Sequence, residues 1–155
     1  MPMVVAQAPE LTAQAWFNAD NEIQLAELRG RVVVLSAFQV LCPHSLSFGV
    51  PQTLRIHRTF DPKEVAVIGL HATFEHHEAI TPAVVKAFIQ EHRLKYPIAL
   101  DRPSKTGPIP ETMERYRMRG TPSLILIDKQ GVIRKHAFGP VDDLRVGAEI
   151  GALTV

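Results

Sequence analysis

The stretch RVVVLSAFQVLCPHS, residues 31–45, decides which fold the chain is expected to adopt. Its first eight residues form a short, β-branched and nearly continuous apolar run, which is typical of a central strand buried on both faces. Residues 43–60 behind it carry apolar side chains along one face of a predicted helix. The stretch therefore predicts a buried strand that leads, within a few residues, to Cys42 at the start of a helix.

Strand and helix patterns alternate along the rest of the chain. Further buried strands are predicted at 65–71 and 123–129, a short strand at 96–100, a hairpin strand at 131–138 and an N-terminal strand pair at Ala15–Asn18 and Glu22–Gln24. Helices are predicted at 81–93, where Thr81 is the N-cap and Pro82 the first helical residue, and near 110–117 and 141–150. This order predicts one α/β domain over residues 1–155, with a mixed central sheet and helices on both faces.

Composition narrows the possible functions. The net charge of +1 comes from interspersed signs, so nothing favours a nucleic acid or an anionic membrane as partner. No apolar run reaches the roughly 20 residues that a membrane helix needs. No basic residue precedes the short apolar N-terminal stretch, because the first is Arg29, and we therefore expect no signal peptide and a cytoplasmic location. A single cysteine excludes an internal disulfide.

Three pieces of sequence carry a family resemblance. A buried strand leads into Cys42, Thr121-Pro122 stands before another buried strand, and a glycine turn with a closing strand follows. LRGRVVVLSAF and TPSLILIDKQGVIRKHAFG resemble the thioredoxin fold, and more closely its TlpA/redoxin (AhpC/TSA-like) branch, over roughly residues 9–150. The resemblance implies thiol–disulfide exchange or thiol peroxidase chemistry, and hence an antioxidant or redox role, with protein or small-molecule thiols, disulfides or peroxide as partners.

The resemblance also assigns site residues. It implies that Cys42 is the attacking cysteine, that Ser45 stands where the resolving cysteine would be, and that Thr121-Pro122 is the pair whose cis bond faces the cysteine. Two departures concern local structure. Pro51 lies one residue further from the cysteine than in most relatives, which predicts a bulge or an extra residue in the first turns, and Gln39 occupies the place of the peroxiredoxin threonine.

The start of a helix is a suitable place for a reactive thiol. Free backbone N–H groups and the positive end of the helix dipole stabilise a thiolate there, and Pro43 suits the first turn. His44 would help if protonated, and Pro-His between the two active-site positions resembles DsbA-type disulfide oxidases. Ser45 is either an inert replacement or a hydrogen-bond donor to the thiolate one turn away. The opposing interpretation is that Cys42 is a small buried hydrophobe.

Two further segments are candidates for the site. Beside a cis Pro122, the backbone of Thr121 would let a substrate segment pair as an added strand. His71 ends a buried strand, so it should lie at the same sheet edge as Cys42 and is a candidate substrate contact. The segment HATFEHHEA, residues 71–79, is either a solvated polar loop, which we favour, or a metal site. We predict no cofactor, since the chain has no glycine-rich phosphate loop.

The sequence leaves three hypotheses for function. In the first, Cys42 is the nucleophile of a monothiol redox enzyme that an external thiol such as glutathione regenerates. In the second, the scaffold binds a partner peptide beside Pro122 without turnover. In the third, Cys42 and His71 carry a metal. The basic residues around Arg117 and Arg119 are interpreted as solvated charges that line, at most, one entrance.

Overall fold

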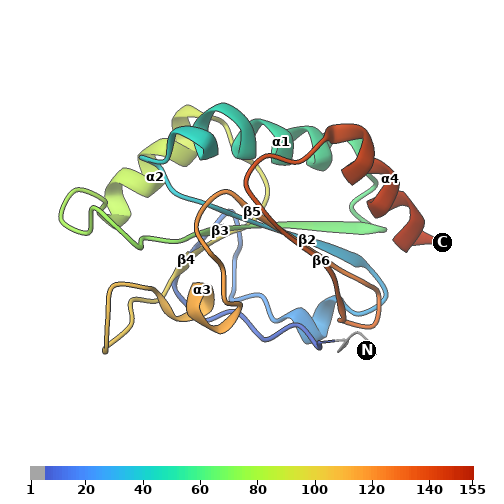
Figure 1. The fold of residues 1–155 in the computed structure, drawn as a ribbon, viewed down its shortest axis with the longest axis horizontal. Helices are drawn as coiled ribbons and strands as arrows, with labels where there is room; N and C mark the ends of the chain where they lie inside the picture. Colours follow the sequence, from blue (N-terminus) through green and yellow to red (C-terminus); the bar gives the residue numbers. More distant parts are fainter. Residues whose placement is uncertain (1–5) are drawn as a thin grey trace.

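A six-stranded mixed sheet forms the centre of the protein, seen in a computed structural model that describes residues 6–155 (Figure 1). The strands are β1 (Ala13–Phe17), β2 (Val32–Phe38), β3 (Val65–His71), β4 (Ile98–Asp101), β5 (Ser123–Ile127) and β6 (Ile133–Phe138). Their order is β1-β4-β3-β2-β5-β6, with β2, β3 and β4 parallel and the other pairs antiparallel. The predicted mixed sheet, with 31–38 in its middle, is confirmed.

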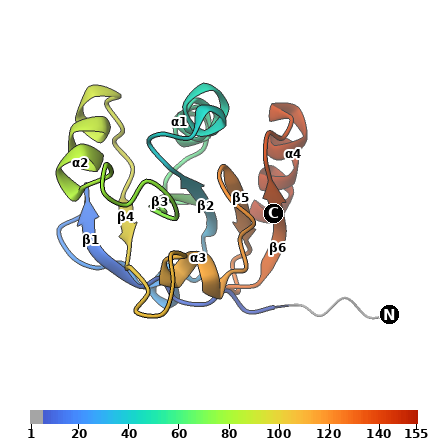
Figure 2. The same cartoon turned by 60° about the vertical axis from the view of Figure 1, so that its left-hand side comes forward.

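Helices cover both faces of the sheet (Figure 2). Those on one face are α1 (Val50–Thr59), α2 (Pro82–Glu91) and α4 (Asp143–Thr154), and α3 (Glu111–Arg115) lies on the other. A short 3₁₀ helix, η1 (Leu25–Leu28), and a π-helical segment, η2 (Ser45–Gly49), complete the order. The predicted cap of α2 is confirmed, since the Thr81 hydroxyl accepts a hydrogen bond from the Val84 N–H at 3.3 Å. No helix within residues 6–155 has the length and apolarity needed to cross a membrane.

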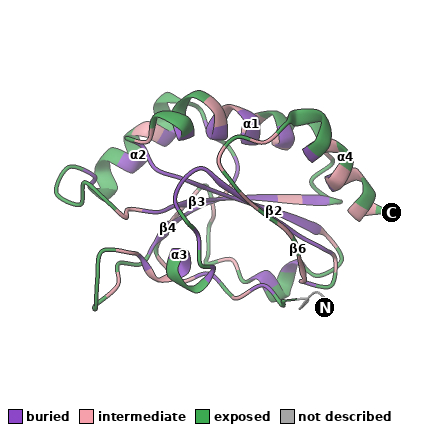
Figure 3. Ribbon diagram, in the orientation of Figure 1, coloured by how far each residue is buried: buried purple, intermediate pink, exposed green. Residues whose placement is uncertain are grey.

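Strand β2 is buried along its whole length, because two apolar layers meet on it (Figure 3). Val34 belongs to the layer beneath α1, α2 and α4, and its neighbour Leu35 to the layer that includes η1 and α3. Successive side chains of a strand point to opposite faces, so a run without polar alternation requires cover on both sides. The apolar run at 31–38 thus fixes the strand at the centre, and with it the place where Cys42 emerges.

The predicted strand at Glu22–Gln24 is wrong. These residues have no strand pairing, and β1 pairs instead with the edge strand β4, Ala15 opposite Leu100. The cause is a contact that is distant in sequence: the Glu10 carboxylate accepts hydrogen bonds from the N–H groups of Leu25 and Ala26 and so anchors the start of η1. Residues 1–5, part of the segment behind the expectation of no signal peptide, lie outside the described residues.

Candidate active site

Cys42 stands at the start of the helix that follows β2. Its N–H donates to the Gln39 carbonyl at 3.0 Å, and its own carbonyl accepts from the Leu46 N–H at 3.1 Å, so it begins the first helical turn. The side chain is half-buried. Its Sγ–H donates to the carbonyl oxygen of Thr121 at 3.3 Å, a contact between residues 79 positions apart. The cysteine is therefore accessible from solvent and faces the predicted proline loop.

The proline loop has the predicted form. The Thr121–Pro122 peptide bond is cis, and both residues are buried. Gly49 approaches Pro122 so closely that a Cβ on the glycine would lie 2.7 Å from the proline Cβ. The sequence analysis missed Gly49, and its only local signal is a glycine inside an otherwise regular helix. Its missing side chain lets the active-site helix lie directly on the proline, which keeps Thr121 beside the sulfur.

Ser45 has a defined role toward the thiol. Its side chain is fully buried, and its Oγ accepts a hydrogen bond from the Gln39 N–H at 3.2 Å. The hydroxyl also lies close enough to the Cys42 side chain to lower the pKa of its thiol. With one acceptor site taken by the Gln39 N–H, its O–H remains free to donate to sulfur. The position of the hydroxyl favours the hydrogen-bond donor of the two interpretations, and donation to sulfur stays a prediction.

Hydrogen bonds also set the ionisation of Cys42. Burial raises the pKa of its thiol, but the neighbouring Ser45 and Thr121 side chains and the Ser45 and His44 backbone outweigh burial and leave the pKa below its usual value. The Thr121 hydroxyl is buried and has no hydrogen-bond partner of full geometry among the described residues. The site therefore favours the thiolate, which is the nucleophilic form of cysteine.

Of the two predicted irregularities in the first turns, a bulge or an extra residue, the structure shows a bulge. Five residues, Ser45–Gly49, form a π-helical turn, and Pro51 lies in the first turn of α1 behind it. Single π turns inside α-helices are often found at functional sites. The bond from Leu46 N–H to the Cys42 carbonyl keeps the turn before it α-helical. The bulge thus leaves Cys42 and Ser45 on one helix face, as in an ordinary first turn.

His71 lies at the same sheet edge as Cys42, as predicted. Strands β2 and β3 are parallel, and Phe38 is paired with His71. The imidazole is fully buried, and its Nε2 accepts a hydrogen bond from the Val40 N–H at 3.2 Å. Burial lowers the pKa of His71 to about 4, so the ring is neutral near pH 7. This burial argues against the predicted contact with substrate: His71 supports the loop that carries Cys42 from beneath.

Of the other predicted site residues, one is buried in the loop before Cys42 and two face solvent. Gln39 is fully buried, and its Oε1 accepts from the Leu41 N–H at 2.9 Å, so it shapes the loop and does not face a substrate. Pro43 and His44 are exposed directly behind Cys42. They form the solvent side of the site, whereas Thr121 and Pro122 form its inner wall.

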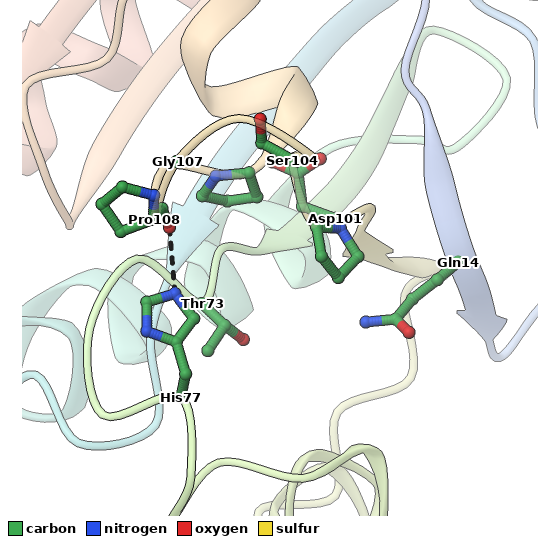
Figure 4. Close-up of a pocket in the computed structure, with 9 residues that line it drawn as sticks. Gln14, Thr73, His77, Asp101, Ser104, Gly107 and Pro108 are labelled. Carbon is green, nitrogen blue, oxygen red and sulfur yellow. Dashed lines mark hydrogen bonds between the residues drawn. The ribbon is translucent and has the colours of Figure 1, made fainter.

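The histidine-rich segment does not assemble a metal site. Within residues 6–155, no group of three or more His, Cys, Asp or Glu side chains could hold a metal ion. His77 instead hydrogen-bonds through Nε2 to the Pro108 carbonyl at 2.9 Å, and both residues line a pocket of about 220 Å³ (Figure 4). The carboxylate of Asp101 in that pocket accepts from the N–H groups of Thr112 and Met113. The hypothesis that Cys42 and His71 carry a metal loses support too, because the Nε2 lone pair of His71 accepts the hydrogen bond from the Val40 N–H.

The mixed sheet, the thiol at a helix start and the cis-proline loop facing it define a thioredoxin-like fold. The sequence model of the AhpC/TSA family matches residues 4–136, and the chain belongs to this family. Both findings confirm the family resemblance inferred from the sequence.

Solved structures and curated proteins give the same picture. A crystal structure of a thioredoxin-like superfamily protein is 51% identical, with a TM-score of 0.93 over 96% of both chains. A thiol-disulfide isomerase from Corynebacterium glutamicum is 47% identical, with a TM-score of 0.90 over 95% of this chain and 96% of that one. The thiol-disulfide oxidoreductase ResA of Bacillus cereus is 26% identical over 119 residues, which cover 77% of this chain and 61% of the length of ResA.

Proposed function

We propose that the chain is a thiol–disulfide oxidoreductase that works through Cys42 alone. One observation carries the proposal: a half-buried sulfur at the start of a helix lies 3.3 Å from the Thr121 carbonyl oxygen of the cis-proline loop. An inert core cysteine would have no such place at a helix start and no exposed surface. Membership of the AhpC/TSA family supports the proposal, as do relatives named as thiol-disulfide isomerase and oxidoreductase.

The first step needs only one thiolate. The lone pair of the Cys42 sulfur forms a bond to one sulfur of a disulfide, and the other sulfur leaves as a thiolate with the electrons of the broken bond. The product is a mixed disulfide on Cys42. The Ser45 hydroxyl and the neighbouring backbone lower the pKa of Cys42 and so favour the ionised sulfur before this step.

The second step must use an outside thiol. A mixed disulfide is broken by a thiolate that attacks one of its sulfurs, and a serine hydroxyl near neutral pH is neither ionised nor able to restore a disulfide. Ser45 therefore stabilises Cys42 but does not release it. An external thiolate attacks the mixed disulfide, carries away the bound group as a new disulfide and leaves Cys42 as the thiolate.

The proline loop is the proposed place for a substrate segment. The carbonyl of Thr121 points at the sulfur, so an extended peptide beside it would be held within reach of Cys42. Backbone pairing with residue 121 would position a substrate independently of its sequence, as strand addition does. Proteins and small molecules that carry thiols or disulfides are therefore the proposed partners.

A mass spectrum of the intact protein tests the proposal. After incubation with oxidised glutathione, we expect one glutathione bound through a disulfide that a reductant removes, and none on the Cys42→Ser variant. A parallel incubation with hydrogen peroxide shows whether the same thiol is also oxidised to a sulfenic acid, as the peroxidase alternative requires. If the folded protein formed no adduct at any pH up to about 9, where even an unperturbed thiol is substantially ionised, the second hypothesis, a binding module without turnover, would replace the proposal.

A further inference from the structure

A basic hollow lies next to the proline loop. It has a volume of about 440 Å³ and is lined by Arg117, Arg119, His136 and Phe138. Two of these residues belong to the segment that leads into Thr121, and two to the edge strand β6. Phe138 is 49% exposed, so its ring offers apolar surface at this hollow.

The positive charge of this hollow is not compensated. Arg117 and Arg119 are exposed, and none of the ion pairs found within residues 6–155 includes either of them. None of the four residues that line the hollow carries a carboxylate. The Arg119 guanidinium lies over the Phe138 ring, 5.8 Å from its centroid, and this contact restrains a side chain that would otherwise move freely in water.

The hollow is close to the reactive sulfur. Gly120 packs so tightly on Phe138 that a Cβ on the glycine would lie 2.7 Å from the ring, and the Gly139 N–H donates to the Pro122 carbonyl at 2.8 Å. Arg119 stands two residues before Thr121, so their Cα atoms are at most about 7.6 Å apart. The Thr121 carbonyl is 3.3 Å from the Cys42 sulfur, so the short segment that carries Arg119 leads directly to the residue beside the sulfur.

We propose that this hollow binds the carboxylate end of a small peptide-sized thiol whose sulfur exchanges with Cys42. The inference rests on the proposed function, because a single-cysteine enzyme needs an outside thiol and therefore a place to hold it. Arginine guanidinium groups bind carboxylates with two parallel hydrogen bonds, and Phe138 offers an apolar wall for the peptide stem. The exchange is balanced: a glutathione thiolate attacks the mixed disulfide on Cys42, one S–S bond forms as another breaks, and Cys42 leaves as the thiolate.

The first test compares two disulfides on the same thiol. Oxidised glutathione carries carboxylates and 2-hydroxyethyl disulfide has no charge, so the ratio of their rates with Cys42 measures recognition of the carboxylate. We expect the double variant Arg117→Gln, Arg119→Gln to lower this ratio ~3- to 10-fold, as exposed ion pairs allow, and raised salt to shrink the wild-type ratio. The matched control Arg145→Gln, an exposed arginine on α4 across the sheet, should keep both rates.

The second test does not depend on the reaction. S-methylglutathione cannot exchange, and its binding to the Cys42→Ser variant is measured by NMR titration, with shifts expected at Arg117, Arg119 and Phe138 and lost in the double arginine variant. An unchanged rate ratio, or binding that the arginine changes do not weaken, would overturn the inference while leaving Cys42 chemistry intact. A thiol inert toward both disulfides would instead overturn the proposed function, and the titration would still decide whether the hollow binds carboxylates.

Discussion

Replacing Ser45 by alanine isolates the hydrogen bond that holds the Cys42 thiolate. Among the groups that lower the pKa of Cys42, the Ser45 side chain makes the largest contribution, and it comes from a fully buried hydroxyl. The substitution removes one oxygen and leaves the backbone N–H donors in place. It also leaves the Gln39 N–H without its acceptor, which should cost roughly 1–3 kcal/mol of stability.

The size of the effect follows from two opposing terms. A hydrogen bond to a charged group contributes roughly 1.5–3 kcal/mol, and the lower end applies here because the sulfur is half-exposed to solvent. A loss of about 1.4 kcal/mol lowers the ionisation constant about tenfold. The thiolate that still forms is more basic and hence ~3-fold more nucleophilic. We therefore expect reaction at neutral pH to slow ~3-fold, and reaction at a pH where both proteins are fully ionised to speed up ~3-fold.

The pH dependence of alkylation measures both the ionisation of Cys42 and the nucleophilicity of its thiolate. Iodoacetamide reacts with the thiolate, and mass spectrometry follows the loss of free Cys42 in the wild type and in Ser45→Ala between about pH 5 and pH 10, around the range in which perturbed thiols titrate. The matched control is Ser47→Ala, an exposed serine two positions further along the same segment, which should reproduce the wild-type profile. Superimposable profiles for wild type and Ser45→Ala would refute the role assigned to the hydroxyl.

Three other changes test the surroundings of the thiol. The pKa of His71 is about 4 in the folded protein against 6.5 in the unfolded chain, so between these pH values the unfolded state binds a proton that the folded state does not. The free energy of unfolding should therefore fall by up to about 3 kcal/mol from pH 6.5 to pH 4. Denaturant titrations of the His71→Gln variant should lack this dependence on pH. Ser45→Cys should give a dithiol that reduces insulin, because the bond from the Leu46 N–H to the Cys42 carbonyl makes the turn between the two positions α-helical; absence of an internal disulfide after oxidation would contradict this geometry. Gly49→Ala should lower the free energy of unfolding by about 1–3 kcal/mol and slow the alkylation of Cys42, because the new Cβ would meet Pro122. The control Gly147→Ala, which faces open space on α4, should raise the free energy of unfolding by roughly 0.5–1 kcal/mol. Equal effects of the two substitutions would show that Gly49 is not needed for close approach to Pro122.

Local sequence predicted the structure correctly where the residues that determine it lie within the same segment. The Thr81-Pro82 cap of α2 needs only the residues around it, and the displaced Pro51 was enough to predict an irregularity in the first turns, which the structure shows as a π turn. The predicted strand at Glu22–Gln24 failed for the opposite reason. There the deciding group, the Glu10 carboxylate, lies 15 residues before Leu25, and no pattern within the segment reveals it.

The central strand, the helix that starts at Cys42, the family resemblance and the candidate thiol could all be predicted from the residues alone, because hydrophobic periodicity and caps act over a few neighbouring residues. The surroundings of that thiol became visible only in the folded chain. Tertiary packing placed Thr121 beside the sulfur, buried His71 beneath the loop, and brought Arg119 and Phe138 together at one hollow. The physical reason is that burial, hydrogen-bond partners and local charge depend on which distant segments pack together, and strand order sets those neighbours.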